Sequence, residues 1–217
     1  YESDKNRLMV INLNTNEITD LTRDFDNNVA GLVWSADDQE VLAGVQVRGT
    51  REIFAFATDG QKVRQLTHDY HYITGFNIAD NQLLATQTWG DYPTEVYLYN
   101  MTDSLSKGQK ITAVNDKLLS QIRFGKCEEH WVNTVDGKQM LTWVVYPYDY
   151  DSTKTYPALL YCLGGPQGLT APTWNTRWNW QMFSAAGYFV IAPNRRGCTG
   201  FGQQWCEQVS GDYGGLC

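Results

Sequence analysis

The stretch that decides the fold is residues 53–67, IFAFATDGQKVRQLT, an apolar strand followed by a polar turn and a short second strand. This pattern occurs three times, and the copies end at Thr22, Thr67 and Thr112, with 45 residues between successive ends. Two further short strands precede the second and third copies, and they are expected at residues 32–35, 40–47, 75–78 and 82–88. The repeating unit therefore has four strands in 45 residues.

A four-stranded unit with a period of about 40 to 45 residues is typical of β-propeller blades. The apolar strands in residues 53–57 and 96–99 carry large side chains on both faces, as expected for a sheet between two neighbouring sheets. An antiparallel sandwich with accidental spacing is the alternative. About two and a half blades are visible, whereas propellers close with roughly four to eight, so we expect the chain to be part of a longer polypeptide.

The pattern changes near residue 128. Residues 131–147 predict two strands around an Asp136-Gly137 hairpin. After them the sequence predicts a buried strand at residues 158–163, a glycine-rich loop, a helix near residues 175–186 that ends at Gly187, and a strand at residues 188–192. Strand, loop, helix and strand form the start of an α/β layer with parallel strands.

Composition excludes several classes of function. The 17 basic and 24 acidic residues give a net charge of −7, which argues against nucleic acid as a partner. No apolar run reaches the roughly 18–20 residues of a membrane span. Five cysteines without a Cys-x-x-Cys pair argue against zinc and dithiol chemistry, so neither a metal nor another cofactor is expected. Cys206 and Cys217 are candidates for a disulfide, and the alternative is that they are ordinary thiols.

Four motifs in the second half occur in a specific order: DGKQMLTWVVYP, YPALLYCLGGPQ, GYFVIAPNRRGCTGFG and GDYGG. With the blades before them, they closely resemble the prolyl oligopeptidase family of serine peptidases, in particular its dipeptidyl-peptidase and acylaminoacyl-peptidase branch. The resemblance implies β-propeller blades of four antiparallel strands in residues 1–127 and the N-terminal part of an α/β-hydrolase domain in residues 128–217. It also implies release of dipeptides or N-terminal residues from short peptides through an acyl-enzyme. Related bacterial peptidases are often exported, so a periplasmic or cell-envelope location is expected.

The resemblance places an oxyanion donor in the glycine-rich loop. In α/β hydrolases one such donor is a backbone N–H from the loop after the third strand. Its place in the motif makes Gly165 the candidate, with Gly164 supplying the turn and Pro166 holding the loop's exit. A glycine lets the reacting carbonyl approach the backbone without a Cβ in the way, although a turn that needs positive φ would also select glycine. Some family members carry a tyrosine donor where this chain has Leu163, so the chain resembles the acylaminoacyl-peptidase pattern, with backbone donors alone.

The catalytic triad itself is not visible. The sequence has no Gly-x-Ser-x-Gly, and in this fold Ser, Asp and His follow in that order after the motifs present here. We therefore expect the chain alone to be inactive. His68, His71 and His130 precede the hydrolase strands, so we expect surface or interface residues and not bases. Asp212 of GDYGG is interpreted as a loop-ordering acid.

Weaker candidates for substrate binding are Arg195 and Trp174. Adjacent residues usually point apart, so we expect one of Arg195 and Arg196 to form a structural ion pair and the other to be solvated. Trp174, Trp178 and Trp180 either line an apolar pocket or pack in the core beneath the helix. The glycines after the second parallel strand lack the spacing of a phosphate loop: Gly197, Gly200 and Gly202.

Two classes of function remain. The first is a serine exopeptidase whose partners are short peptide substrates and the remainder of the same polypeptide. The second is a propeller-based binding module with a catalytically inactive α/β-hydrolase segment. A Gly-x-Ser-x-Gly within a few tens of residues after Cys217 would favour the first.

Overall fold

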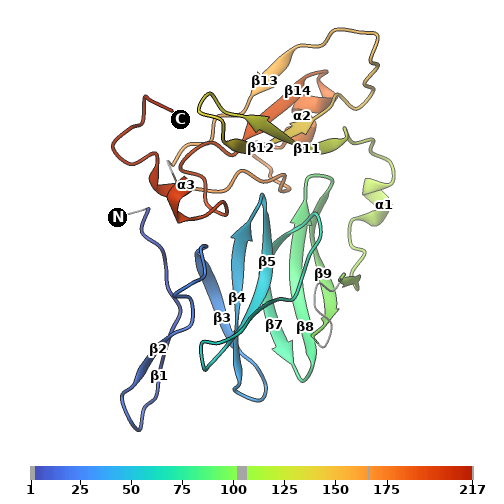
Figure 1. Ribbon diagram of the computed structural model, residues 1–217. Helices are drawn as coiled ribbons and strands as arrows, with labels where there is room; N and C mark the ends of the chain where they lie inside the picture. Colours follow the sequence, from blue (N-terminus) through green and yellow to red (C-terminus); the bar gives the residue numbers. More distant parts are fainter. Residues whose placement is uncertain (1–2, 102–106, 166, 217) are drawn as a thin grey trace.

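The structure is a computed structural model of the 217-residue chain and describes residues 3–101, 107–165 and 167–216. A set of antiparallel blades forms one part, and a mixed four-stranded sheet sits over one end of the blades (Figure 1). The short helix α1 (Asp116–Leu119) lies on the connection between the two parts. Pro166 and Cys217, to which the sequence assigned a loop exit and a candidate disulfide, lie outside the described residues. In the described part of the chain no helix is long and apolar enough to span a membrane.

The first part contains half a blade and two four-stranded blades, as the repeat predicts. The half blade is a hairpin of β1 (Met9–Ile11) and β2 (Ile18–Asp20). The second blade consists of β3 (Val29–Trp34), β4 (Glu40–Val47), β5 (Thr50–Ala57) and β6 (Val63–Gln65). The third consists of β7 (Tyr72–Ala79), β8 (Gln82–Trp89), β9 (Tyr92–Asn100) and β10 (Gln109–Lys110). A single parallel bridge, Arg51 to Tyr72, connects the two complete blades.

A threonine closes each repeat in the same way. Its hydroxyl accepts the backbone N–H of the first residue of its own repeat: Leu8 to Thr22 at 2.9 Å, Ile53 to Thr67 at 3.0 Å and Val96 to Thr112 at 2.9 Å. The predicted equivalence of the three threonines is confirmed. The strands that begin the second and third copies, β5 and β9, are not neighbours in one sheet, because β7 and β8 lie between them.

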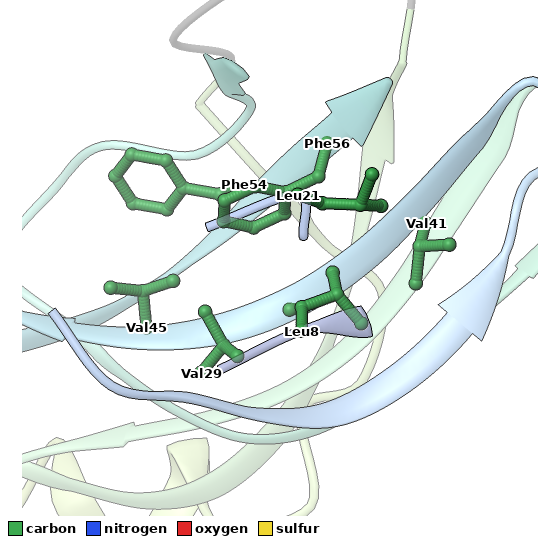
Figure 2. Close-up of a cluster of buried hydrophobic side chains, with 8 residues drawn as sticks. Leu8, Leu21, Val29, Val41, Val45, Phe54 and Phe56 are labelled. Carbon is green, nitrogen blue, oxygen red and sulfur yellow. The ribbon is translucent and has the colours of Figure 1, made fainter. Parts of the chain in front are cut away.

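Side chains on the two faces of the second blade enter different cores, which explains why its strands are apolar on both faces. Phe54 and Phe56 of β5 pack towards the half blade in a cluster that Figure 2 shows with Leu8, Leu21, Val29, Val41 and Val45. The alternate residues Ile53 and Ala55 pack towards the third blade, with Ile73 and Leu83. Full burial of a side chain such as Phe56 contributes roughly 1.5–3 kcal/mol.

The second part is a sheet in the order β11-β12-β14-β13. The hairpin of β11 (Cys127–Asn133) and β12 (Gln139–Val145) turns at Gly137, whose φ is +79°. β12 pairs antiparallel with β14 (Phe189–Pro193), and β13 (Ala158–Leu160) pairs parallel with β14, as expected for the start of an α/β layer. The helices are α2 (Trp180–Ala185) and α3 (Gln203–Glu207). The domain boundary after residue 127 stays a prediction, and β11 begins at Cys127.

Two predicted elements are shorter than expected. The helix begins at Trp180, because the side chain of Asn175 accepts the N–H groups of Arg177 and Trp178 in a separate turn, while Asn179 caps the helix by accepting from Gln181. Asparagine side chains compete with helical backbone bonds in this way. Strand β13 ends at Leu160, before the predicted end of the strand at residue 163.

The expected position of the histidines is wrong for His71. Its side chain is buried, and its Nε2 lies 2.7 Å from the buried Oε2 of Glu52, which also accepts the hydroxyl of Thr67 at 2.6 Å. A buried carboxylate needs such partners, and the histidine supplies one of them. His68 and His130 are exposed, as expected.

Candidate active site

The glycine loop, residues 163–168, follows β13 at the carboxyl end of a parallel strand. Gly165 has a φ of +140°, and a Cβ there would lie 3.1 Å from the carbonyl oxygen of Gln167. Gly164 is not among the residues with positive φ, and a Cβ there would meet nothing within 4 Å. The positive φ of the loop therefore falls on Gly165 and not on Gly164, and the donor role of Gly165 stays a prediction.

The N–H of Gly165 is available to a ligand. Gly165 is exposed, and its N–H donates no hydrogen bond to another described residue. A backbone N–H held in a fixed loop and free of internal partners can donate to a developing oxyanion. The neighbouring Leu163 has an apolar side chain, whose Cδ2 would lie 3.4 Å from a Cβ at residue 168. This side chain has no hydroxyl, so only backbone N–H groups of the described loop residues are candidate oxyanion donors here.

The segment after β14, residues 194–199, holds the glycine loop and its continuation, and we call it the clamp segment. Arg195 Nη2 donates to the carbonyl oxygen of Leu163 at 2.9 Å, and the N–H of Thr199 donates to the carbonyl oxygen of Gly168 at 3.1 Å. Asn194, which is fully buried, accepts the N–H of Thr170 at 2.9 Å and donates to its carbonyl oxygen at 3.0 Å. The loop is therefore held near its start, at its end and just beyond it.

Trp205 of α3 supports the clamp segment from behind. Its Nε1 donates to the carbonyl oxygens of Asn194 and Arg195, at 3.2 and 3.0 Å. Cys198 lies within the segment and is fully buried, and burial raises the pKa of its thiol to about 11. The thiol is therefore neutral near pH 7 and does not present a thiolate nucleophile beside the loop.

The two arginines of the clamp segment point apart, as expected. Arg196 is buried, forms an ion pair with Asp136, and donates to Gln208 at 2.8 Å and to the carbonyl oxygen of Leu216 at 2.9 Å. The expectation that the other arginine is solvated is wrong, because Arg195 is half-buried and donates to two backbone carbonyls. The hairpin turn, the residue that follows α3 and the residue that follows GDYGG thus meet at Arg196.

The glycines of the GCTGFG motif fit the second part of the chain onto the blades. The tip of the β4–β5 hairpin donates its Arg48 N–H to the carbonyl oxygen of Gly200 at 2.9 Å, and Thr199 donates to the side chain of Gln46 at 2.6 Å. Gly200 has a φ of +88°, and a Cβ there would lie 3.1 Å from the backbone of Gln46. At Gly202 a Cβ would meet the carboxylate of Asp26 at 2.5 Å. Close approach to the propeller backbone therefore explains glycine at residue 200, and the φ of +90° explains it at Gly202.

The three tryptophans after the glycine loop lie in different surroundings. Trp180 is buried in the core of the second part, whereas Trp178 is 49% exposed. Trp174, the candidate for substrate binding, is half-buried and packs edge-on against Phe124 with 6.2 Å between ring centroids. Its role in substrate binding stays a prediction.

A cavity of about 950 Å³ lies where the blades meet the second part. Its walls include Arg48, His68, Tyr70, Trp131 and Phe201, but none of the described glycine-loop residues. This cavity is therefore separate from the candidate oxyanion donor, and the role of the glycine loop stays a prediction.

The sequence alone did not indicate Asn194, Thr199 or Trp205. The one available signal was the placement of NRRGCT directly after the second parallel strand. Strand ends of neighbouring parallel strands meet at one edge of a sheet, so this segment and the glycine loop had to be close.

The chain has relatives among known proteins. Residues 174–217 match the prolyl oligopeptidase family model. Dipeptidyl-peptidase 5 of Porphyromonas gingivalis is 39% identical over 215 residues, which cover 99% of this chain and 31% of that protein. Dipeptidyl-peptidase 5 of Porphyromonas endodontalis is 37% identical over 169 residues, which cover 78% of this chain and 24% of that protein. The chain thus spans about a quarter to a third of the length of these relatives.

The fold has a counterpart of known structure. Acylaminoacyl peptidase of Pyrococcus horikoshii matches 100% of this chain and 32% of its own, with a TM-score of 0.83 at 19% identity. The blades and the second sheet of this chain therefore share the fold of that protein. The sequence relatives identify the family. The chain belongs to the prolyl oligopeptidase family of serine peptidases.

Proposed function

We propose that this chain is the propeller-to-hydrolase portion of a serine exopeptidase that releases dipeptides from the amino termini of short peptides. The observation that carries the proposal is the 39% identity to a dipeptidyl-peptidase 5, which extends over both parts of the chain. In this proposal the blades limit access to short peptides, and the remainder of the polypeptide supplies Ser, Asp and His.

Gly165 has a defined role in the proposed reaction. When the serine attacks the scissile carbonyl, the carbonyl oxygen becomes an oxyanion, and the exposed Gly165 N–H donates a hydrogen bond to it. Gly165 has a positive φ, and in this proposal the clamp segment, which bonds to Leu163 and Gly168, fixes the loop before substrate binds. A donor placed in advance needs no reorganisation during the reaction, which is the physical source of the rate gain.

Two substitutions in the complete polypeptide test this role. Gly165→Pro removes the N–H, and the loss of one oxyanion donor is expected to lower kcat by about 10²–10³-fold. Gly165→Ala is the matched control, because it strains the same positive φ but keeps the N–H. The assay uses dipeptidyl chromogenic substrates and, in parallel, acyl-aminoacyl substrates, with melting temperatures to verify folding. A folded Gly165→Pro enzyme with the kcat of Gly165→Ala would contradict the assignment.

The second candidate, a binding module without catalysis, gives a different result with a serine-directed fluorophosphonate. The exopeptidase proposal expects stoichiometric labelling of the complete polypeptide and none of the 217-residue chain, which has no Gly-x-Ser-x-Gly. Absence of labelling in the complete polypeptide would favour the binding module. We also propose export from the cell, on the basis of the bacterial relatives, and cell fractionation tests it.

A further inference from the structure

We propose that Arg195 is the positioning residue of the glycine loop, holding the peptide unit that precedes the Gly165 donor. The inference rests on the proposed function of Gly165 and gives Arg195 a structural task in place of the substrate binding that its sequence suggested.

The argument begins with the peptide units of the loop. Arg195 Nη2 donates to the carbonyl oxygen of Leu163 at 2.9 Å, and that carbonyl belongs to the peptide unit joining residues 163 and 164. The Gly165 N–H belongs to the next unit. Since peptide units are rigid planes joined at a Cα, the orientation of the first restricts the direction of the second. Gly164 adds rotational freedom at this joint, so movement of the first unit would add to that of the second, and the contact with Arg195 removes the part that comes from the first unit.

The guanidinium is itself held in place. Its Nη1 donates to the carbonyl oxygen of Arg196 at 2.7 Å, while the carbonyl oxygen of Arg195 accepts from Trp205 at 3.0 Å. One planar group therefore joins the start of the glycine loop to the clamp segment. Arginine suits this task because its donors have a fixed fork geometry, which the single ammonium of lysine cannot reproduce.

The surroundings of Arg195 also argue against a substrate carboxylate as its partner. Its side chain is half-buried, and its two terminal nitrogens are engaged with backbone carbonyls. Arg177, by contrast, is exposed, and its guanidinium carbon lies 5.6 Å from the centroid of the Trp178 ring. This exposed arginine provides a matched control for the same chemical change.

The test uses the complete polypeptide with Arg195→Met, Arg195→Lys and the control Arg177→Met. Displacement of a reacting group by about 1 Å can cost 10²-fold, so Arg195→Met is expected to lower kcat by about 10- to 100-fold with little change in KM. Arg195→Lys is expected to recover only part of this loss, and Arg177→Met to behave as wild type. Added guanidinium ion should partly rescue Arg195→Met, because it can occupy the vacated position.

A second measurement does not depend on activity. Hydrogen exchange followed by mass spectrometry should show faster exchange of the peptide covering residues 163–168 in Arg195→Met than in wild type and Arg177→Met. Unchanged exchange of that peptide would overturn the inference. It would also be overturned if Arg195→Met kept its kcat and raised KM only for peptides with a free carboxylate, the result expected of a substrate-binding arginine.

These outcomes separate the inference from the proposed function. A wild-type polypeptide without peptidase activity would refute the proposed function, while the exchange measurement still decides whether Arg195 holds the loop. An active enzyme in which Gly165→Pro lowers kcat but Arg195→Met does not would refute only the role of Arg195.

Discussion

Replacement of Thr67 by valine tests the threonine that closes each blade. Thr67 is fully buried, accepts the N–H of Ile53 at 3.0 Å and donates to Oε2 of Glu52 at 2.6 Å. Valine has nearly the same shape, so the change removes two hydrogen bonds without leaving a large cavity. It leaves a buried N–H unpaired and a buried carboxylate with one donor fewer.

The expected loss follows from these two bonds. A buried polar group left without a partner costs about 1–3 kcal/mol, and a hydrogen bond to a charged group contributes about 1.5–3 kcal/mol. Glu52 keeps its contact with His71 at 2.7 Å, so the carboxylate is only partly deprived. We therefore expect a loss of about 2–3 kcal/mol in the stability of the second blade.

Native-state hydrogen exchange of the complete polypeptide measures this loss locally. Since about 1.4 kcal/mol corresponds to a factor of ten, amides of β5 that exchange through opening of the blade, Ile53 included, should exchange about 30- to 150-fold faster. Thr94→Val on the exposed side of β9 is the matched control and should stay within about 0.5 kcal/mol of wild type. A folded Thr67→Val protein in which Ile53 exchanges at the wild-type rate would refute the reasoning.

Two further predictions concern the contacts of the second part. Gly200→Ala should lower the melting temperature more than Gly211→Ala, because both have positive φ but only residue 200 meets the propeller backbone; equal losses would contradict the close approach. The hydroxyl of Thr134, followed by the guanidinium of Arg196, holds the pKa of Asp136 below its ordinary value of 3.8. A carboxylate whose pKa is lower in the folded state than in the unfolded state adds stability at pH values above the unfolded-state pKa. This contribution is lost as the pH falls through the folded-state pKa. Below about pH 4, wild type should therefore lose melting temperature more steeply with acidification than Asp136→Asn, and parallel curves would refute this.

Much of the architecture was predictable because it depends on local signals. Four strands in each 45-residue unit and threonines at constant intervals predicted the blades, and the hydroxyl bonds of Thr22, Thr67 and Thr112 confirm their equivalence. The hairpin at Gly137 and the helix end at Gly187 were also predictable, because glycine is favoured where φ is positive.

Other features depended on competition between similar signals. Asn175 and Asn179 are both suitable helix caps, and the sequence placed the helix start at the first, whereas the structure uses the second. His71 was expected at the surface or at an interface, because it precedes the hydrolase strands, and nothing in its neighbourhood along the chain indicated the buried Glu52, which lies 19 residues away. Such partners become visible only when the order of the strands is known.

By itself the sequence determined the repeat, the strand faces, the positions of the turns and the glycine loop, because each follows from side-chain periodicity or from backbone conformation within a few residues. Only the tertiary structure decided what holds that loop. Arg195 reaches Leu163 from 32 residues away, and Thr199 contacts Gln46 across 153 residues. Such contacts depend on which strands become neighbours and in which register, and the burial of distant apolar residues fixes both.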